Sequence, residues 1–340
     1  MTMSTFVWLQ NRVVFGRRTK RMARLLLAAP AIVDSASYRW LYTRRMVGEM
    51  DRLSQKPLFI RMETTNRCRA ACSFCPHQAM KRTEGEMAMG LYERIVSQIR
   101  RMDIGRLNLH GFGEPFLDPH ILERIEIARK AGIRHIATNT NGAALNDKLI
   151  DGCLDTGLDE IYISLDAATE DVYRTMRPGL SFHRVERNIG KLVEAKRKRG
   201  DSRLKIFLSF VECRQNRHEV RPFLKKWSSQ ADGISISYLH NWGDRLNFNP
   251  RGRAVRRDPC RHLWAGLDVN IEGRVPLCCY DYETSIPLGD LKTQDLEEVW
   301  RGEPLARYRK HHLRRDYANI ALCRGCNANY HDKNPWWLSQ

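Results

Sequence analysis

The feature that most constrains the fold is an alternation of short β-rich runs with helical stretches, which begins at Pro57. Strand-like runs separated by longer helical patterns are typical of parallel strands joined by crossover helices. Six strands are predicted, at residues 58–64, 106–110, 133–138, 160–164, 205–211 and 233–238. The helices predicted between them lie at residues 89–102, 119–131, 146–156, 183–198 and 219–229. The chain is therefore predicted to form an α/β fold with a parallel sheet covered by helices.

The six units fit either an open sheet or an incomplete barrel, and periodicity does not separate the two. In both architectures the reactive loops follow the carboxyl ends of the strands. At 340 residues and 42% hydrophobic content, the chain is long enough for one large domain with a smaller module attached.

The pattern changes after Tyr238, where a segment rich in Arg, Asn, Gly and Pro reads as a linker. A hairpin is predicted next, pairing residues 267–269 with 275–277, and then a helix near 295–309. We expect four segments in all. They are a basic, mainly helical arm at 1–56, the strand-helix domain at 57–240, a linker at 241–259 and a small C-terminal domain at 260–340.

The first cysteine cluster follows the first predicted strand, as Cys68-x3-Cys72-x2-Cys75. This spacing suits metal binding better than disulfides, so we expect a reducing compartment, the cytoplasm. Three thiolates can hold three irons of a cube and leave the fourth iron open to a chelating small molecule. A zinc knuckle completed by His77 is the alternative.

With Phe74 before its last cysteine, this loop resembles that of the radical S-adenosylmethionine (SAM) superfamily. The resemblance implies a partial (β/α)6 barrel in which Cys68, Cys72 and Cys75 hold one 4Fe-4S cluster and Phe74 packs near the adenine of SAM. It also implies a reducing partner, such as flavodoxin or ferredoxin. An electron then cleaves SAM to a 5'-deoxyadenosyl radical, which abstracts hydrogen from a substrate.

A glycine-rich loop, Gly111-Phe112-Gly113-Glu114, follows the second predicted strand. Small residues let the backbone approach a ligand, and Glu114 can accept a hydrogen bond from an ammonium group. The loop resembles the family's Gly-Gly-Glu motif, which holds the methionine amino group of SAM, although Phe112 stands at the first position of the triplet. Gly111, Gly113 and Glu114 are therefore predicted to bind SAM.

Polar residues at the next two strand ends resemble the family's contacts to the SAM ribose and carboxylate. They are Asn139, Asn141 and Ser164. An ordinary Asx turn or helix cap would explain each of them equally well.

A second set of cysteines lies near the C-terminus, with twelve residues, then Gly273, then four more residues between its first two members. The predicted ligands are Cys260, Cys278, Cys323 and Cys326. Four thiolates can close around a second 4Fe-4S cluster, and zinc would also accept them. The spacing resembles the first half of a SPASM domain. No cysteine follows Cys326, so the truncated "twitch" form, a β-hairpin and helix around one auxiliary cluster, is implied.

Cys279 adjoins Cys278, and the sequence leaves open which of the two is a ligand, although the spacing from Gly273 favours Cys278. Complete cysteine ligation favours an electron-transfer role for the auxiliary cluster. The predicted reaction is therefore an oxidation. The predicted substrate is a small molecule of sugar or cyclitol type, because no recognisable peptide-recognition domain precedes the barrel. Modification of a peptide substrate stays open.

Cys213 lies just past the fifth predicted strand and is the candidate hydrogen donor if the enzyme is an epimerase. Cysteine is among the most buried residue types, so an apolar filler is the competing interpretation. An alternative of another class is a non-catalytic iron-sulfur or zinc protein that binds nucleic acid through its basic arm.

The formal net charge of +18 predicts attraction to an anionic partner, whether nucleic acid, a phosphorylated substrate or lipid headgroups. Residues 1–55 hold ten Arg and Lys against three acids. Within them, Arg17-Arg18 and the apolar run 25–33 resemble a twin-arginine export signal, but the run is short and holds Pro30. We expect instead an amphipathic helix that packs on the domain or lies on an anionic membrane surface. The predicted location is the cytoplasm, with the membrane periphery as the alternative.

Overall fold

The computed structural model describes residues 55–243, 245 and 259–327. The described residues of Lys56–Pro250 and Cys260–Ala328 form one compact unit. Nearly all of the basic arm and most of the linker lie outside the described residues, as does the predicted membrane-surface contact of the arm. No helix in the described segments is both long and apolar enough to cross a bilayer.

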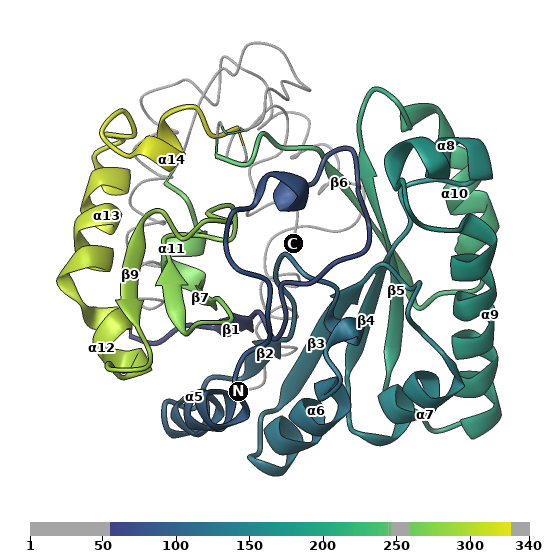
Figure 1. Ribbon diagram of the computed structural model, residues 1–340, viewed down its shortest axis with the longest axis horizontal. Helices are drawn as coiled ribbons and strands as arrows, with labels where there is room; N and C mark the ends of the chain where they lie inside the picture. Colours follow the sequence, from purple (N-terminus) through teal and green to yellow (C-terminus); the bar gives the residue numbers. More distant parts are fainter. Residues whose placement is uncertain (1–54, 244, 246–258, 328–340) are drawn as a thin grey trace, which may run out of the picture. The chain divides into compact units, whose positions relative to one another are not determined.

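A seven-stranded parallel sheet forms the centre of this unit (Figure 1). Its strands are β1 (Phe59–Met62), β2 (Arg106–Asn108), β3 (His135–Thr140), β4 (Glu160–Ser164), β5 (Lys205–Glu212), β6 (Gly233–Tyr238) and β7 (Gly266–Val269). The order is β6-β5-β4-β3-β2-β1-β7, with β6 and β7 at the two edges. The predicted α/β fold with parallel strands, a partial barrel, is confirmed, and each of the six predicted strands is present.

The seventh strand corrects the predicted hairpin. Residues 267–269 do not pair with 275–277; they belong to β7, which pairs in parallel with β1. The hairpin of the C-terminal segment is instead formed by β8 (Arg274–Pro276) and β9 (Pro287–Asp290), which pair antiparallel. An alternating apolar and polar run suits either arrangement, so the sequence pattern alone did not separate them.

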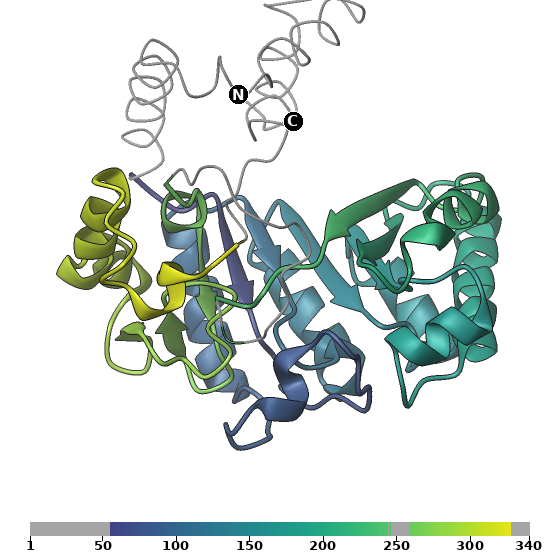
Figure 2. The same ribbon diagram turned by 90° about the horizontal axis from the view of Figure 1, so that it is seen from above.

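Helices fill the connections between the strands and cover one face of the sheet (Figures 1 and 2). They are α5 (Met89–Arg101), α6 (Ile121–Lys130), α7 (Asp147–Asp155), α8 (Glu170–Met176), α9 (Phe182–Arg199) and α10 (Val220–Trp227), with short 3-10 turns η1 (Pro76–Ala79), η2 (Pro115–Leu117) and η3 (Arg217–Glu219). Local chemistry sets several of the ends. The Asn146 side chain accepts from the Leu149 amide at 2.9 Å at the start of α7, and α9 ends at Gly200, whose φ is +73°.

The C-terminal segment carries short helices, α11 (His262–Ala265), α12 (Leu296–Arg301), α13 (Glu303–Leu313) and α14 (Ala321–Arg324). The single helix predicted near 295–309 is divided at Gly302, which has extended backbone angles. Pro304 lies in the first turn of α13, where a missing amide hydrogen costs nothing. This break lets α12 and α13 run in different directions beside the β8-β9 hairpin (Figure 1).

The two faces of the sheet differ sharply in polarity. On β1, Ile60 and Met62 are fully buried under the helices, while Arg61 between them points to the opposite face. Leu107 on β2 is buried in the same way, and Asp268 on β7 lies beside Arg61. The side of the sheet that the helices leave open is therefore lined by charged side chains.

A buried ion pair anchors the start of α6 to the loop after β2. Arg124 Nε donates to Asp118 Oδ2 at 2.8 Å, and both side chains are almost completely buried. Replacing Asp118 with Ala would leave the guanidinium charged and unpaired, which costs about 3–5 kcal/mol. We expect Asp118→Ala to lower the free energy of unfolding by this amount in urea titrations.

The matched control is Glu126→Ala, which removes an exposed pair with Lys130 on the same helix. Exposed i,i+4 pairs contribute about 0.3–0.5 kcal/mol. Equal losses of stability in the two variants would show that the buried pair does not anchor the helix.

Candidate functional site

The first cysteine loop leaves the carboxyl end of β1 and runs into η1. The Cys75 amide donates to the Cys72 carbonyl at 3.1 Å, which folds the loop back on itself. The Ala71 amide donates to the Pro178 carbonyl at 2.9 Å and ties the loop to the segment after α8. None of the three cysteines of the loop forms a disulfide.

Burial raises the pKa of the Cys68 thiol to about 11 and that of the Cys75 thiol to about 12. Each of these thiols also lies close enough to Cys72 for the charge of the Cys72 thiolate to raise its pKa further. Thiolates grouped in such a place need a cationic centre to hold them deprotonated. Three clustered sulfur donors therefore fit an iron-sulfur cluster, as predicted for Cys68, Cys72 and Cys75.

His77, the fourth ligand of the zinc alternative, is directed toward the backbone. Its Nε2 atom lies 2.8 Å from the Asn66 carbonyl oxygen, and the side chain is buried. This contact gives the histidine a structural role at the base of the loop.

The two glycines of the loop after β2 permit close packing against β1 and the cysteine loop. A Cβ atom at Gly111 would lie 2.6 Å from Glu63 Cβ, and one at Gly113 would lie 2.2 Å from the Thr65 carbonyl oxygen. The Glu114 amide donates to the Arg67 carbonyl at 2.8 Å. Close packing thus explains why both positions need glycine. The predicted contact of Gly111 and Gly113 with SAM stays a prediction.

The Glu114 carboxylate joins the ends of β2 and β3. It is 3% exposed and accepts from the Thr140 hydroxyl at 2.6 Å and from the Asn141 amide at 2.7 Å. Burial raises its pKa, and these hydrogen bonds oppose the rise. The Asn141 side chain closes a turn by accepting from the Ala143 amide at 2.9 Å. The structure therefore brings Glu114 and Asn141 together beside the cysteine loop.

Asn139 and Ser164 lie on the open face of the sheet, near the carboxyl ends of β3 and β4. Asn139 is paired with Tyr162, and Ser164 with Ser209. Both are partly exposed, and neither side chain has a hydrogen-bond partner among the described residues. Their polar groups are therefore available to a ligand above the sheet.

Phe74 and Cys213 belong to one apolar cluster behind the first cysteine loop. Phe74 packs there with Met176, Cys213 and Leu239, and Cys72 borders the cluster. Cys213 is 6% exposed, and its Sγ lies 3.8 Å from the sulfur of Met176. These surroundings favour the apolar-filler interpretation of Cys213, and its role as hydrogen donor stays a prediction.

The second set of cysteines is assembled from distant parts of the chain. Cys278 follows β8 and lies within electrostatic reach of Cys260 and Cys323. Tyr280 lies within the same reach of Cys260 and Cys326. Burial raises the pKa of Cys278 far above its usual value, and the neighbouring thiols add to the effect. The segment 278–280 thus lies near the other three predicted ligands, and their binding of one cluster stays a prediction.

Cys279 has charged neighbours on the strands of the main sheet, although it also lies within electrostatic reach of Cys260. Its thiol lies beside Arg61, which lowers the pKa of Cys279 against the larger effect of burial, and it belongs with His262 and Asp268 to one group whose ligand atoms are within 4.8 Å of one another. Arg61 Nη1 is also 3.0 Å from Asp268 Oδ1, so a guanidinium cation already borders this group. Cys279 thus has charged neighbours of its own beside Arg61, and the choice of Cys278 as the ligand stays a prediction.

A cavity of about 170 Å³ opens between β1, β2, β7 and the loop of Cys278 and Cys279. Two ion pairs line it: Arg61 with Asp268, and Arg82 with Glu63, whose bidentate contacts measure 2.8 and 3.0 Å. His110 also lines it, and burial lowers the pKa of its imidazole to about 3, so the ring is neutral.

Aromatic rings form the other wall of this cavity. The ring of Trp242 lies 5.8 Å from that of Phe112 and 5.6 Å from that of Tyr280. Trp242 Nε1 donates to the Phe74 carbonyl at 2.8 Å, next to Cys75. One wall of the cavity is thereby joined to the first cysteine loop, while Cys278 and Cys279 line another part.

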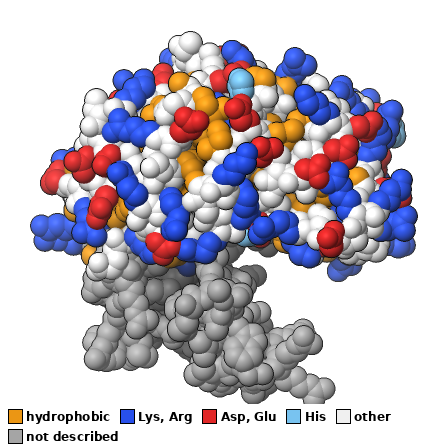
Figure 3. Space-filling model, turned by 90° about the horizontal axis from the view of Figure 1, so that it is seen from below, with side chains coloured by type: hydrophobic (Ala, Val, Ile, Leu, Met, Phe, Trp, Pro, Cys, Tyr) orange, Lys and Arg blue, Asp and Glu red, His pale blue; other side chains and the backbone are white. Residues whose placement is uncertain are grey.

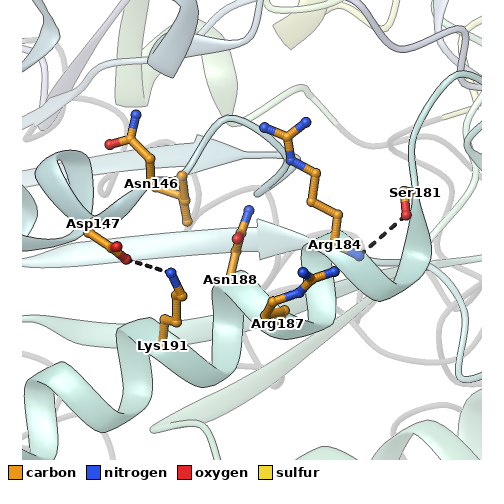
Figure 4. A pocket seen from close by; sticks show the side chains of 8 residues that line it. Asn146, Asp147, Ser181, Arg184, Arg187, Asn188 and Lys191 are labelled. Carbon is orange, nitrogen blue, oxygen red and sulfur yellow. Dashed lines mark hydrogen bonds and ion pairs between the residues drawn. The ribbon is translucent and has the colours of Figure 1, made fainter.

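A larger cavity, of about 460 Å³, lies over the start of α9 (Figure 4). Arg184, Arg187 and Lys191 line it, and Lys191 pairs with Asp147 at 2.7 Å. No predicted site residue lines this cavity, so the smaller cavity is the candidate substrate pocket. On the face shown in Figure 3, basic side chains are spread among acidic ones over the described surface.

Several residues of the pocket were not predicted from the sequence. Arg61 and Glu63 had a signal, because charged residues alternate there with the apolar Ile60 and Met62. Trp242 and Tyr280 had none, since they come from separate loops that meet only in the folded chain.

Family models match two parts of the chain. The radical SAM superfamily matches residues 62–223, and an iron-sulfur cluster-binding domain, SPASM, matches residues 260–327. Among curated proteins, the chain is 26% identical over 241 residues to mycofactocin maturase MftC of Mycobacterium tuberculosis, covering 71% of this chain and 55% of that protein. It is 25% identical over 296 residues to PqqA peptide cyclase of Xanthomonas campestris pv. campestris, covering 74% and 76%.

Two solved structures share the fold. BtrN in complex with AdoMet and 2-DOIA aligns with a TM-score of 0.57 at 17% identity, over 82% of this chain and 97% of that chain. Streptococcus suis SuiB bound to precursor peptide SuiA aligns with a TM-score of 0.63 at 13% identity, over 80% and 71%. Of the curated relatives, mycofactocin maturase is matched by this chain over only about half of its length. From its two cysteine sites and the matched family models, the chain belongs to the radical SAM superfamily and carries a C-terminal SPASM domain.

Proposed function

We propose that this radical SAM enzyme dehydrogenates a small polar molecule, of sugar or cyclitol type, bound in the 170 Å³ pocket. The observation that carries the proposal is the lining of the pocket, which combines fixed ion pairs with aromatic rings between the two cysteine sites. The volume is below the range of about 300–1,000 Å³ usual for drug-sized ligands, which favours a single small ring.

The pocket residues would orient such a ring through its hydroxyl groups. A hydroxyl can donate to Asp268 or accept from Arg61. The contact of 3.0 Å between Arg61 and Asp268 holds both side chains in place. Hydrogen bonds to charged groups are about twice as strong as neutral ones, so this pair would fix the orientation of the substrate. Trp242 and Phe112 offer ring faces on which the C–H side of a substrate can pack.

The cysteines would hold the cofactors, with Cys68, Cys72 and Cys75 at the first cluster and Cys260, Cys278, Cys323 and Cys326 at the second. With both clusters and SAM bound, the first site would supply abstraction of a hydrogen atom from the substrate, and the second would supply an acceptor for the remaining electron. Loss of the hydroxyl proton to water then completes the conversion of an alcohol to a carbonyl. Asn139 and Ser164, whose side chains are available on the open face, would contact SAM.

Peptide modification is the second candidate function. It is favoured by the similarity to mycofactocin maturase and PqqA peptide cyclase. A peptide would have to present one side chain to the same small pocket. The two functions therefore differ in whether the rest of the substrate extends outside the pocket. Nucleic-acid binding without catalysis loses its basis, since the family models match the catalytic domain.

Anaerobically reconstituted protein is expected to contain about eight irons per chain, from two 4Fe-4S clusters. Replacing Cys68, Cys72 and Cys75 with Ala should leave about four irons and abolish SAM cleavage. Cys278→Ala should disturb the second cluster, whereas Cys279→Ala should retain eight irons, because Cys279 faces Arg61. Iron and zinc analysis by plasma mass spectrometry gives the readout. Four irons with one zinc would contradict the second assignment.

Asp268→Asn is expected to raise KM for the substrate about tenfold, because it removes a charged hydrogen-bond acceptor from the pocket. The substrate is first sought by adding sugars, aminocyclitols or peptides to the reduced enzyme and measuring 5'-deoxyadenosine above the uncoupled background. Arg184→Gln, in the larger cavity, is the control and should leave KM unchanged. A response to peptides alone would favour the second candidate function.

Cys213→Ala is expected to give the same dehydrogenated product as the wild type, because Cys213 lies in an apolar cluster. Product analysis by mass spectrometry in deuterated water provides the test. An epimerised product that incorporates solvent deuterium, and is lost in Cys213→Ala, would instead identify this thiol as the hydrogen donor.

A further inference from the structure

A buried guanidinium, Arg177, lies directly beside the first cysteine loop. Its Nη1 atom is 3.5 Å from the Sγ atom of Cys72, within hydrogen-bond range for sulfur. Only 6% of Arg177 is exposed. A charged group in such a position interacts strongly with its neighbours, because little water screens it.

Asp166 holds this guanidinium in place. The Asp166 carboxylate is completely buried and accepts from Arg177 through Nε, at 2.8 Å, and through Nη2. Its other oxygen accepts from the Val211 amide at 2.6 Å, which fixes the carboxylate to β5. Asp166 adopts a φ of +60°, a conformation that non-glycine residues rarely adopt. The ion pair is thus built into the sheet.

Two further contacts restrict Arg177. Its Cζ atom lies 5.7 Å from the centre of the Phe74 ring, a cation-π contact within the cysteine loop. The Ser73 amide donates to the Met176 carbonyl at 3.1 Å, so the backbone next to Arg177 is tied to the same loop. Because Nε and Nη2 of Arg177 donate to Asp166, Nη1 is the guanidinium nitrogen that reaches Cys72.

The charge of Arg177 persists in this environment. Burial by itself disfavours the cation, but the Asp166 carboxylate and the Cys72 sulfur together raise its pKa. Hydrogen bonds to the cysteine sulfurs of an iron-sulfur cluster, and the net charge around it, are main determinants of its reduction potential. A donor and a positive charge both stabilise the reduced form, which carries one more electron.

We propose that Arg177 is a positioning residue that donates a hydrogen bond to the Cys72 thiolate and raises the reduction potential of the cluster held by the first loop. Asp166 orients it for this contact. The inference rests on cluster ligation by Cys72 and is independent of the substrate.

The test is a redox titration of the reconstituted full-length enzyme without SAM or substrate, followed by electron paramagnetic resonance. The signal of the first cluster is identified as the one whose shape changes when SAM is added. In Arg177→Gln, the ratio of reduced to oxidised first cluster at a fixed potential should fall about tenfold. For a one-electron couple this corresponds to a midpoint about 59 mV lower.

Arg174→Gln is the matched control, because Arg174 lies on α8, three residues earlier, and is exposed. It should leave the potential of the first cluster unchanged. Arg177→Lys keeps the charge but not the planar fork, so its ratio should fall by less than tenfold in the same direction. If Arg177→Gln fails to bind eight irons, Arg177→Lys carries the test.

An unchanged potential in Arg177→Gln with full iron content would overturn the proposal. The same conclusion would follow if Arg177→Lys had the wild-type potential or a higher one. A variant whose potential is unchanged but whose SAM affinity is reduced would assign Arg177 to SAM binding instead. Failure of the sugar and cyclitol assays would leave the titration result intact, since no substrate is present in it.

Discussion

The parallel pairing of β1 with a neighbour on each side is the constraint on which the site depends. β1 pairs with β2 and with β7, although β7 begins more than two hundred residues later in the chain. The cysteine loop leaves the carboxyl end of this strand, so the pairing places the loop of β2 on one side of it and the C-terminal segment on the other. Because Ile60 and Met62 are fully buried, the register of β1 is fixed, and Arg61 has to face the open side.

The charged lining of the open face is stabilised by pairing each ion with a counterion. Arg61 contacts Asp268 at 3.0 Å and Arg82 binds Glu63 through two contacts, so neither guanidinium is left buried and alone. A buried charge without a partner would cost several kcal/mol, about 3–5 by the usual measure. The pairs therefore allow a polar pocket inside an otherwise apolar architecture, and they hold their oxygen and nitrogen atoms ready for a polar substrate.

The two cysteine sites differ in the charged groups that lie next to their sulfur atoms. At the first, a buried cation, Arg177, reaches the sulfur of Cys72. At the second, the cation Arg61 lies beside Cys279, next to the predicted ligand Cys278, and burial raises the pKa of Cys278 as it does for the thiols of the first loop. Different electrostatic surroundings give clusters different potentials, which an oxidation with electron transfer between the sites requires. Under the proposal above, Arg177 contributes to that difference at the first site.

The sequence by itself determined the first six strands, the helices between them, the grouping of the cysteines by spacing and the side of the sheet on which the first cysteine loop lies. These follow from local periodicity and spacing, which are properties of neighbouring residues. The tertiary structure decided that residues 266–269 join the main sheet, that Cys279 turns toward Arg61 and that Arg177 reaches Cys72. Each of these is a contact between segments far apart in the chain, and an alternating run or a lone arginine is compatible with many partners until the fold brings one of them within reach.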